Sequence, residues 1–92
     1  MISLDDCIAM CGLDEAEIEA IAEHEHVPEI AAAALAGYLL HEAGGEREIR
    51  RMIVDDIHKA LDEGCIEHAN RLFMALRHFL TTHPRAQGAT VD

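Results

Sequence analysis

Aromatic residues are nearly absent from this sequence, and that absence limits how its core can be built. There is no tryptophan, and Tyr38, Phe73 and Phe79 are its only tyrosine and phenylalanine residues. Half of the residues are still hydrophobic, so disorder is not expected and the core must consist mainly of Ala, Leu, Ile and Met. Because Ala, Leu and Met are strong helix formers, whereas strands favour β-branched and aromatic residues, the composition predicts an all-α fold.

Basic residues are also few. Seven Lys and Arg stand against eighteen Asp and Glu, which gives a formal net charge of −11. Charge of this sign repels phosphate backbones and anionic membranes, so no nucleic acid and no membrane is expected as a partner. Residues 8–21 have the sequence pattern of a helix-turn-helix. A DNA-binding protein of that type needs a basic recognition helix, however, and residues 14–25 contain no Lys or Arg.

Long hydrophobic runs and a disulfide framework are missing as well. The longest apolar run, residues 30–40, is too short to span a bilayer. Residues 1–12 lack the basic and apolar segments of a secretory signal, and three cysteines are an odd number, so we expect a cytoplasmic protein with reduced thiols. Cys7 and Cys11 lie one helical turn apart and could supply half a zinc site, although small core residues often have the same spacing.

Glycine and proline stand where helices would end. Ser3 and Asp14 are typical N-caps, and Glu17 completes a capping box with Asp14. We expect five helices, from Ser3 to Gly12, from Asp14 to Pro28, from Pro28 to about Glu42, from Glu46 to Glu63 and from Ile66 to Thr82. Residues 1–84 would form a single helical domain, and residues 85–92 a flexible C-terminal tail.

The third predicted helix differs from the last two in how its apolar residues are distributed. Residues 30–40 are apolar all round, which is typical of a helix buried on most sides. The fourth and fifth helices each have one apolar stripe and are expected to pack on it. We predict a compact bundle of about five helices, two short and three longer, around this alanine-rich central helix. Because a chain of 92 residues would cover so apolar a helix poorly, we also predict a homodimer.

Several titratable residues are predicted to point towards the core, where each needs a partner. At about 100° per residue, Asp56 falls within the apolar stripe of its helix, and Glu25 on the isoleucine face of the second helix. His68 lies at the edge of the last stripe, and His26 is next to Glu25. A buried, unpaired carboxylate costs several kcal/mol or takes up a proton. We therefore consider a site for a divalent transition metal (Zn, Mn or Fe) formed by Glu25, His26, Asp56 and His68. The alternative is that the acids pair with arginines or cap a neighbouring helix.

Two acid–histidine pairs, Glu23/His26 and Asp55/His58, also have the (i, i+3) spacing of metal ligands in di-iron carboxylate bundles. Helical phase predicts that Asp55 and His58 face solvent, and that Glu23 lies away from the isoleucines of its helix. The spacing alone therefore does not place the chain among those proteins.

No signature of catalysis is present. The single serine, Ser3, is a predicted cap, and Gly44-Gly45 is followed by Glu46 instead of the Lys of a phosphate-binding loop. The main hypothesis is a small, acidic, cytoplasmic, non-enzymatic interaction or regulatory module that binds a protein partner or itself. The alternative is a metal-binding helical bundle that uses the carboxylate and histidine cluster.

Overall fold

The computed structural model describes residues 13–86. In this range the chain forms α2 (Glu15–Glu25), α3 (Glu29–Leu40), α4 (Gly45–Asp62), α5 (Ile66–Thr82) and the 3-10 helix η1 (Pro84–Ala86), with no strand. The predicted all-α class is confirmed, with four α-helices in the described range instead of five. The predicted first helix, with Cys7 and Cys11, lies outside the described residues.

Local signals in the sequence fix the ends of α2. Asp14 Oδ1 accepts the backbone N–H of Glu17 at 2.9 Å, and Glu17 Oε1 accepts that of Asp14 at 3.0 Å, so the predicted capping box is present. At the other end, His26 adopts the left-handed conformation, with φ 59°, and its backbone N–H donates to the carbonyl of Ala22. The helix therefore ends at Glu25, four residues before Glu29, where α3 begins.

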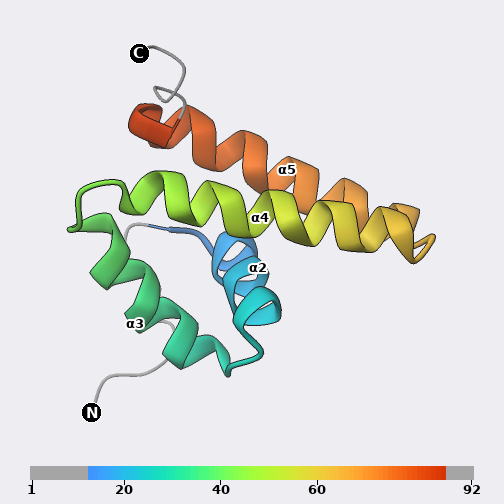
Figure 1. The fold of residues 1–92 in the computed structure, drawn as a ribbon, viewed down its shortest axis with the longest axis horizontal. Coiled ribbons are helices and arrows are strands. Elements are labelled where there is room, and N and C mark those ends of the chain that lie inside the picture. Colours follow the sequence, from blue (N-terminus) through green and yellow to red (C-terminus); the bar gives the residue numbers. More distant parts are fainter. Residues whose placement is uncertain (1–12, 87–92) are drawn as a thin grey trace.

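The central helix is α4 (Figure 1), which contacts α2, α3, α5 and η1. In this view it lies between α5 and the pair formed by α2 and α3, while α2 also contacts α5. The main contacts of α3 are with α2 and α4, so the prediction that the alanine-rich helix is central is wrong. The amphipathic helix α4 is the longest, with 18 residues, and it is long enough to pack against all the others.

The core is aliphatic, as the composition predicts, with Phe79 buried among isoleucines. The phase of α4 agrees with its sequence pattern: Asp56 is 2% exposed, whereas the neighbouring Asp55 is exposed. Ala86 in η1 is fully buried, so the packed part of the chain extends two residues beyond the predicted boundary at residue 84.

Although α3 is the most apolar helix, one of its faces is not covered by the described chain. Ile30 and Tyr38 are 49% and 61% exposed, and Ala31 and Ala34 between them are also exposed. Within residues 13–86, no helix combines the length and the apolar character that crossing a membrane requires.

Candidate functional site

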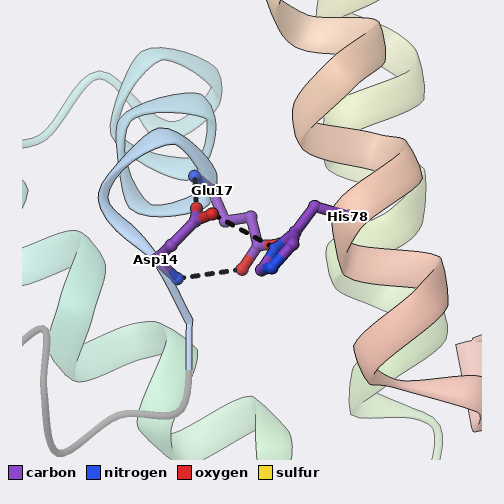
Figure 2. A group of neighbouring side chains, drawn as sticks. All are labelled: Asp14, Glu17 and His78. Atoms are coloured by element: carbon purple, nitrogen blue, oxygen red, sulfur yellow. Dashed lines mark hydrogen bonds and ion pairs between the residues drawn. The ribbon is translucent and has the colours of Figure 1, made fainter.

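Glu17, at the start of α2, is fully buried, and both of its oxygens have partners. Oε1 belongs to the capping box, and Oε2 lies 2.7 Å from Nδ1 of His78 on α5. Oδ2 of Asp14 lies 3.1 Å from the same nitrogen. Both carboxylates of the capping box therefore converge on one imidazole of another helix (Figure 2).

A hydrogen on Nδ1 of His78 explains why the carboxylates of Asp14 and Glu17 lie so close to this imidazole. Nδ1 carries at most one hydrogen, and the shorter distance indicates that it donates to Glu17. The hydrogen bond to Glu17 and the charge of Glu17 raise the pKa of His78. Burial raises the pKa of Glu17, although its hydrogen bonds from His78 and the backbone of Asp14 offset part of that increase. Both shifts favour retention of a proton between α2 and α5.

A second histidine of α5 contacts the other end of α2. Nε2 of His68 lies 2.7 Å from Oε1 of Glu23, while its Nδ1 faces a guanidinium nitrogen of Arg71 at 3.5 Å. These contacts match the tautomer in which Nε2 carries the hydrogen and donates it to Glu23. Because His78 bonds the start of α2 and His68 its end, the two helices are antiparallel here. The two links are about 9 Å apart along α2 and about 15 Å apart along α5.

A groove of about 460 Å³ lies between these two links. Its apolar lining consists of Ala16 and Ala20 from α2 and Leu72, Met74 and Ala75 from α5. The polar lining residues are Asp14 at the cap of α2, Glu19 and Glu23 on α2, and His68, Arg71 and His78 on α5. A concave site of this size, mostly apolar and with a few polar groups, is typical of binding sites in proteins.

Asp56, the second buried acid, lacks the partners that Glu17 has. Its Oδ2 has no hydrogen-bond partner in the part of the chain that the structure describes. Burial, and then the charge of Glu23, raise the pKa of Asp56 to about 7, although the charges of His24 and Lys59 act in the opposite direction. This carboxyl group therefore changes its charge within the physiological pH range.

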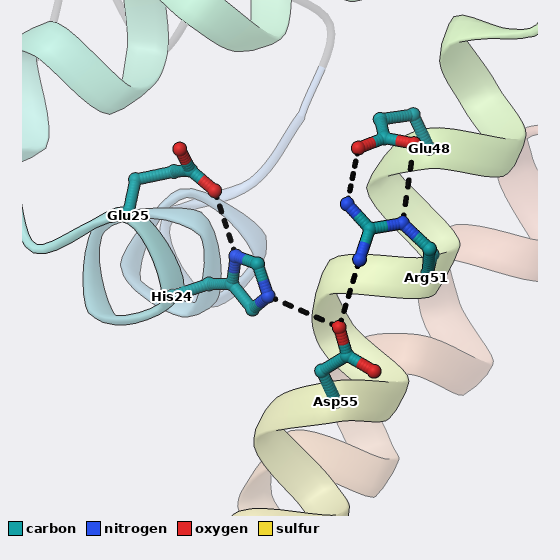
Figure 3. A network of polar contacts seen from close by, with 5 residues as sticks. All are labelled: His24, Glu25, Glu48, Arg51 and Asp55. Atoms are coloured by element: carbon teal, nitrogen blue, oxygen red, sulfur yellow. Dashed lines mark hydrogen bonds and ion pairs between the residues drawn. The ribbon is translucent and has the colours of Figure 1, made fainter.

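A surface network joins the end of α2 to α4 (Figure 3). Nδ1 of His24 lies 2.7 Å from Glu25 and its Nε2 lies 3.2 Å from Asp55, which also accepts a hydrogen bond from Arg51 at 2.9 Å. Arg51 further binds Glu48 through two nitrogens, which lowers the pKa of that carboxyl group. Burial alone lowers the pKa of His24, but the two carboxylates at its ring nitrogens outweigh it and raise the pKa overall. Both nitrogens can donate only when the imidazole is charged.

The structure places the four predicted metal ligands in different surroundings. Asp56 is buried, as helical phase predicts, and His68 is half-buried at the groove and bonded to Glu23. Glu25 and His26 are exposed, so the prediction that Glu25 shares the buried face of its helix is wrong. Glu25 lies in the last turn of α2, where the left-handed His26 directs the chain towards α3.

Two other groups bring potential ligand atoms together. Within residues 13–86, the sets whose ligating atoms all lie within 4.8 Å of one another are Asp14, Glu17 and His78, and Glu15, Glu19 and Glu29. Neither set contains a predicted ligand, and the site predicted from Glu25, His26, Asp56 and His68 stays a prediction.

Sequence reasoning missed the tertiary roles of Glu17, His78 and Glu23. One signal for Glu17 was present, because it lies midway between Leu13 and Ile21 at four-residue spacing, on a face that the structure buries. No comparable signal marks His78, whose side chain is 51% exposed. Glu23 was predicted to lie away from the core, and its contact with His68 exists because α5 passes along that side of α2.

Comparison of the chain with protein-family models, with curated proteins and with solved structures finds no match in any of the three.

Proposed function

We propose that the protein is a non-enzymatic interaction module of the cytoplasm, and that two copies associate through the exposed face of α3. The supporting observation is that this helix is apolar all round, yet one arc of it is uncovered. Ile30, Ala34, Tyr38 and Ala31 fall within about 100° of the helix circumference. All four are exposed, although two of them are large apolar residues. Contiguous exposed apolar surface is typical of association sites.

The distribution of charge makes this face of α3 more favourable for contact between two copies than the rest of the protein surface. The protein has a net charge of −11, so two copies repel one another across most orientations. The exposed arc of α3 contains no charged side chain between Ile30 and Tyr38. Like charges are therefore kept apart when two copies meet along this helix.

The arc is also complementary to itself. In an antiparallel pairing with the two-fold axis at Ala34, Ile30 of one copy lies opposite the partner's Tyr38, and the reverse contact follows by symmetry. Ala31, Ala34 and Gly37 are small and let the two helix backbones approach closely. Antiparallel pairing also brings Glu29, at one end of α3, near His41 of the other copy.

Sedimentation velocity at micromolar concentration tests this proposal. The wild type should sediment with twice the chain mass of 10.1 kDa. Tyr38→Glu should weaken the dimer by about a hundredfold or more, since an isologous interface loses the side chain twice. Phe73→Glu is the matched control, because Phe73 is 56% exposed on α5, away from this face. A monomeric wild type, or equal effects of the two substitutions, would contradict the proposal.

Metal binding is the second candidate function, and the unpartnered, buried Oδ2 of Asp56 favours it. The proposed ligands remain Glu25, His26, Asp56 and His68, with Zn, Mn or Fe as the ion. Elemental analysis after growth in medium rich in these metals should then find a stoichiometric metal that Asp56→Ala removes. Loss on His78→Ala instead would assign the metal to the capping-box cluster. A protein without metal would exclude this function.

A further inference from the structure

The groove between α2 and α5 has a shape and lining that could accommodate one more helix. Ala16 and Ala20 are four residues apart on α2, and these small side chains let another backbone approach the groove. The α5 wall includes Met74, which is 59% exposed. Methionine is flexible and polarisable and adapts to the shape of a bound apolar surface. His68 and His78 are about 15 Å apart along α5, which corresponds to between two and three turns of a bound helix.

The rim of the groove carries more negative than positive charge. Its acids are Asp14, at the cap of α2, and Glu19 and Glu23 on α2, whereas α5 contributes Arg71, His68 and His78. His78 contacts Asp14 and His68 contacts Glu23, so Glu19 is the rim acid that no histidine of α5 contacts. Carboxylate oxygens of Glu15, Glu19 and Glu29 also lie within 4.8 Å of one another, which adds negative charge beside the groove. Among the described residues, no ion pair joins any of these three glutamates to a cation.

Neither the rest of this chain nor a second copy matches that charge. Residues 1–12 and 87–92 contain no Lys or Arg, and the first of these segments adds Asp5 and Asp6. A second copy would bring its own net charge of −11 to an acidic rim. The matching occupant therefore has apolar side chains for the floor and cationic side chains for the α2 rim.

We propose that this groove binds a basic amphipathic helix of another protein. Apolar residues of that helix at positions i, i+4 and i+7 would contact Ala16, Leu72, Met74 and Ala75, as in other helix-in-groove complexes. Lysines or arginines beside this stripe would lie against Glu19 and its acidic neighbours. The inference rests on the protein being an interaction module, but not on the α3 face, which is a separate surface.

A designed peptide provides the probe. A fluorescent helix of about 18 residues, made of alanine, lysine and leucine with the leucines on one face, is titrated with the full chain. The control peptide has the same composition, with its leucines spread around the helix. Met74→Glu is compared with Phe73→Glu, since these neighbours are 59% and 56% exposed and only Met74 lines the groove. Circular dichroism verifies that each variant is folded, and Ala16→Glu repeats the test from the opposite wall.

The amphipathic peptide should bind the wild type and Phe73→Glu equally, and Met74→Glu about tenfold more weakly. Amide NMR shifts on peptide addition should concentrate at Ala16, Ala20 and Ala75. Glu19→Gln should weaken binding and reduce its salt dependence more than Glu63→Gln, whose position on the end of α4 is outside the groove.

Three results would overturn the proposal: equal binding by Met74→Glu and Phe73→Glu, equal binding of the control peptide, or groove shifts that follow protein concentration without peptide. The last result would assign the groove to a second copy. Repeating the titration with Tyr38→Glu separates the two surfaces. If the wild type is monomeric but binds the peptide, only the proposal of dimerisation through α3 is refuted. If the wild type is a dimer that does not bind the peptide, only the proposal of helix binding in the groove is refuted.

Discussion

Replacing Asp56 with asparagine measures the free energy that the fold loses by holding an ionised carboxylate in its core. The side chain is 2% exposed and its Oδ2 has no partner among the described residues. Asparagine has nearly the same shape and no charge. The difference in unfolding free energy between the variant and the wild type therefore depends on pH only through the titration of Asp56.

The magnitude and sign follow from the shift. The pKa of Asp56 is raised from 3.8 to about 7 in the native state, and each unit corresponds to about 1.36 kcal/mol. The native protein therefore keeps a proton that the unfolded chain has lost between these two values. Its stability falls as pH rises through this window and levels off above it, by about 4 kcal/mol in all from this group.

Urea unfolding followed by circular dichroism between pH 5.5 and 8.5 tests this value. The unfolding free energy of Asp56→Asn relative to the wild type should rise by about 2 kcal/mol over that interval, with most of the rise below pH 7. A constant offset from the new amide does not affect this slope. Asp62→Asn, at an exposed position in the last turn of α4, is the matched control for the change of residue type. A difference for Asp56→Asn that is flat with pH would refute the reasoning.

Four further substitutions test particular contacts. Gly45→Ala should destabilise the fold by about 3 kcal/mol in urea unfolding, because the new Cβ would lie 1.6 Å from a backbone oxygen of α3. Gly44→Ala should destabilise it by only about 1 kcal/mol, because the new Cβ meets open space and the cost comes from the left-handed backbone, with φ +79°. His26→Gly should raise the unfolding free energy by about 0.5–1 kcal/mol, because glycine adopts the left-handed cap without strain, and a decrease would contradict this. The pKa of His78 is raised by its bond to Glu17, so its contribution is complete at low pH and lost as pH rises through the raised pKa. His78→Gln should therefore lower the thermal midpoint more at pH 6 than at pH 9, and the opposite order would exclude a charged pair.

Within residues 13–86, the helices and their phases could be predicted because they depend on residues a few positions apart. The Asp14–Glu17 capping box joins residues three apart and was correctly predicted from its pattern. The inward position of Asp56 and the outward position of Asp55 follow from the alternation of apolar residues along one helix. The same reasoning was wrong for Glu25, because α2 ends there and the chain turns away from the core.

Composition and local spacing were enough to predict an acidic, all-α chain with an aliphatic core. Which helix is central, which face of α3 stays exposed and which acids acquire histidine partners depend instead on how the helices pack. Glu17 and His78 are 61 positions apart, and Glu23 and His68 are 45 apart. No periodicity in the chain relates such residues; the packing of α5 along α2 brings them together and forms the groove between them.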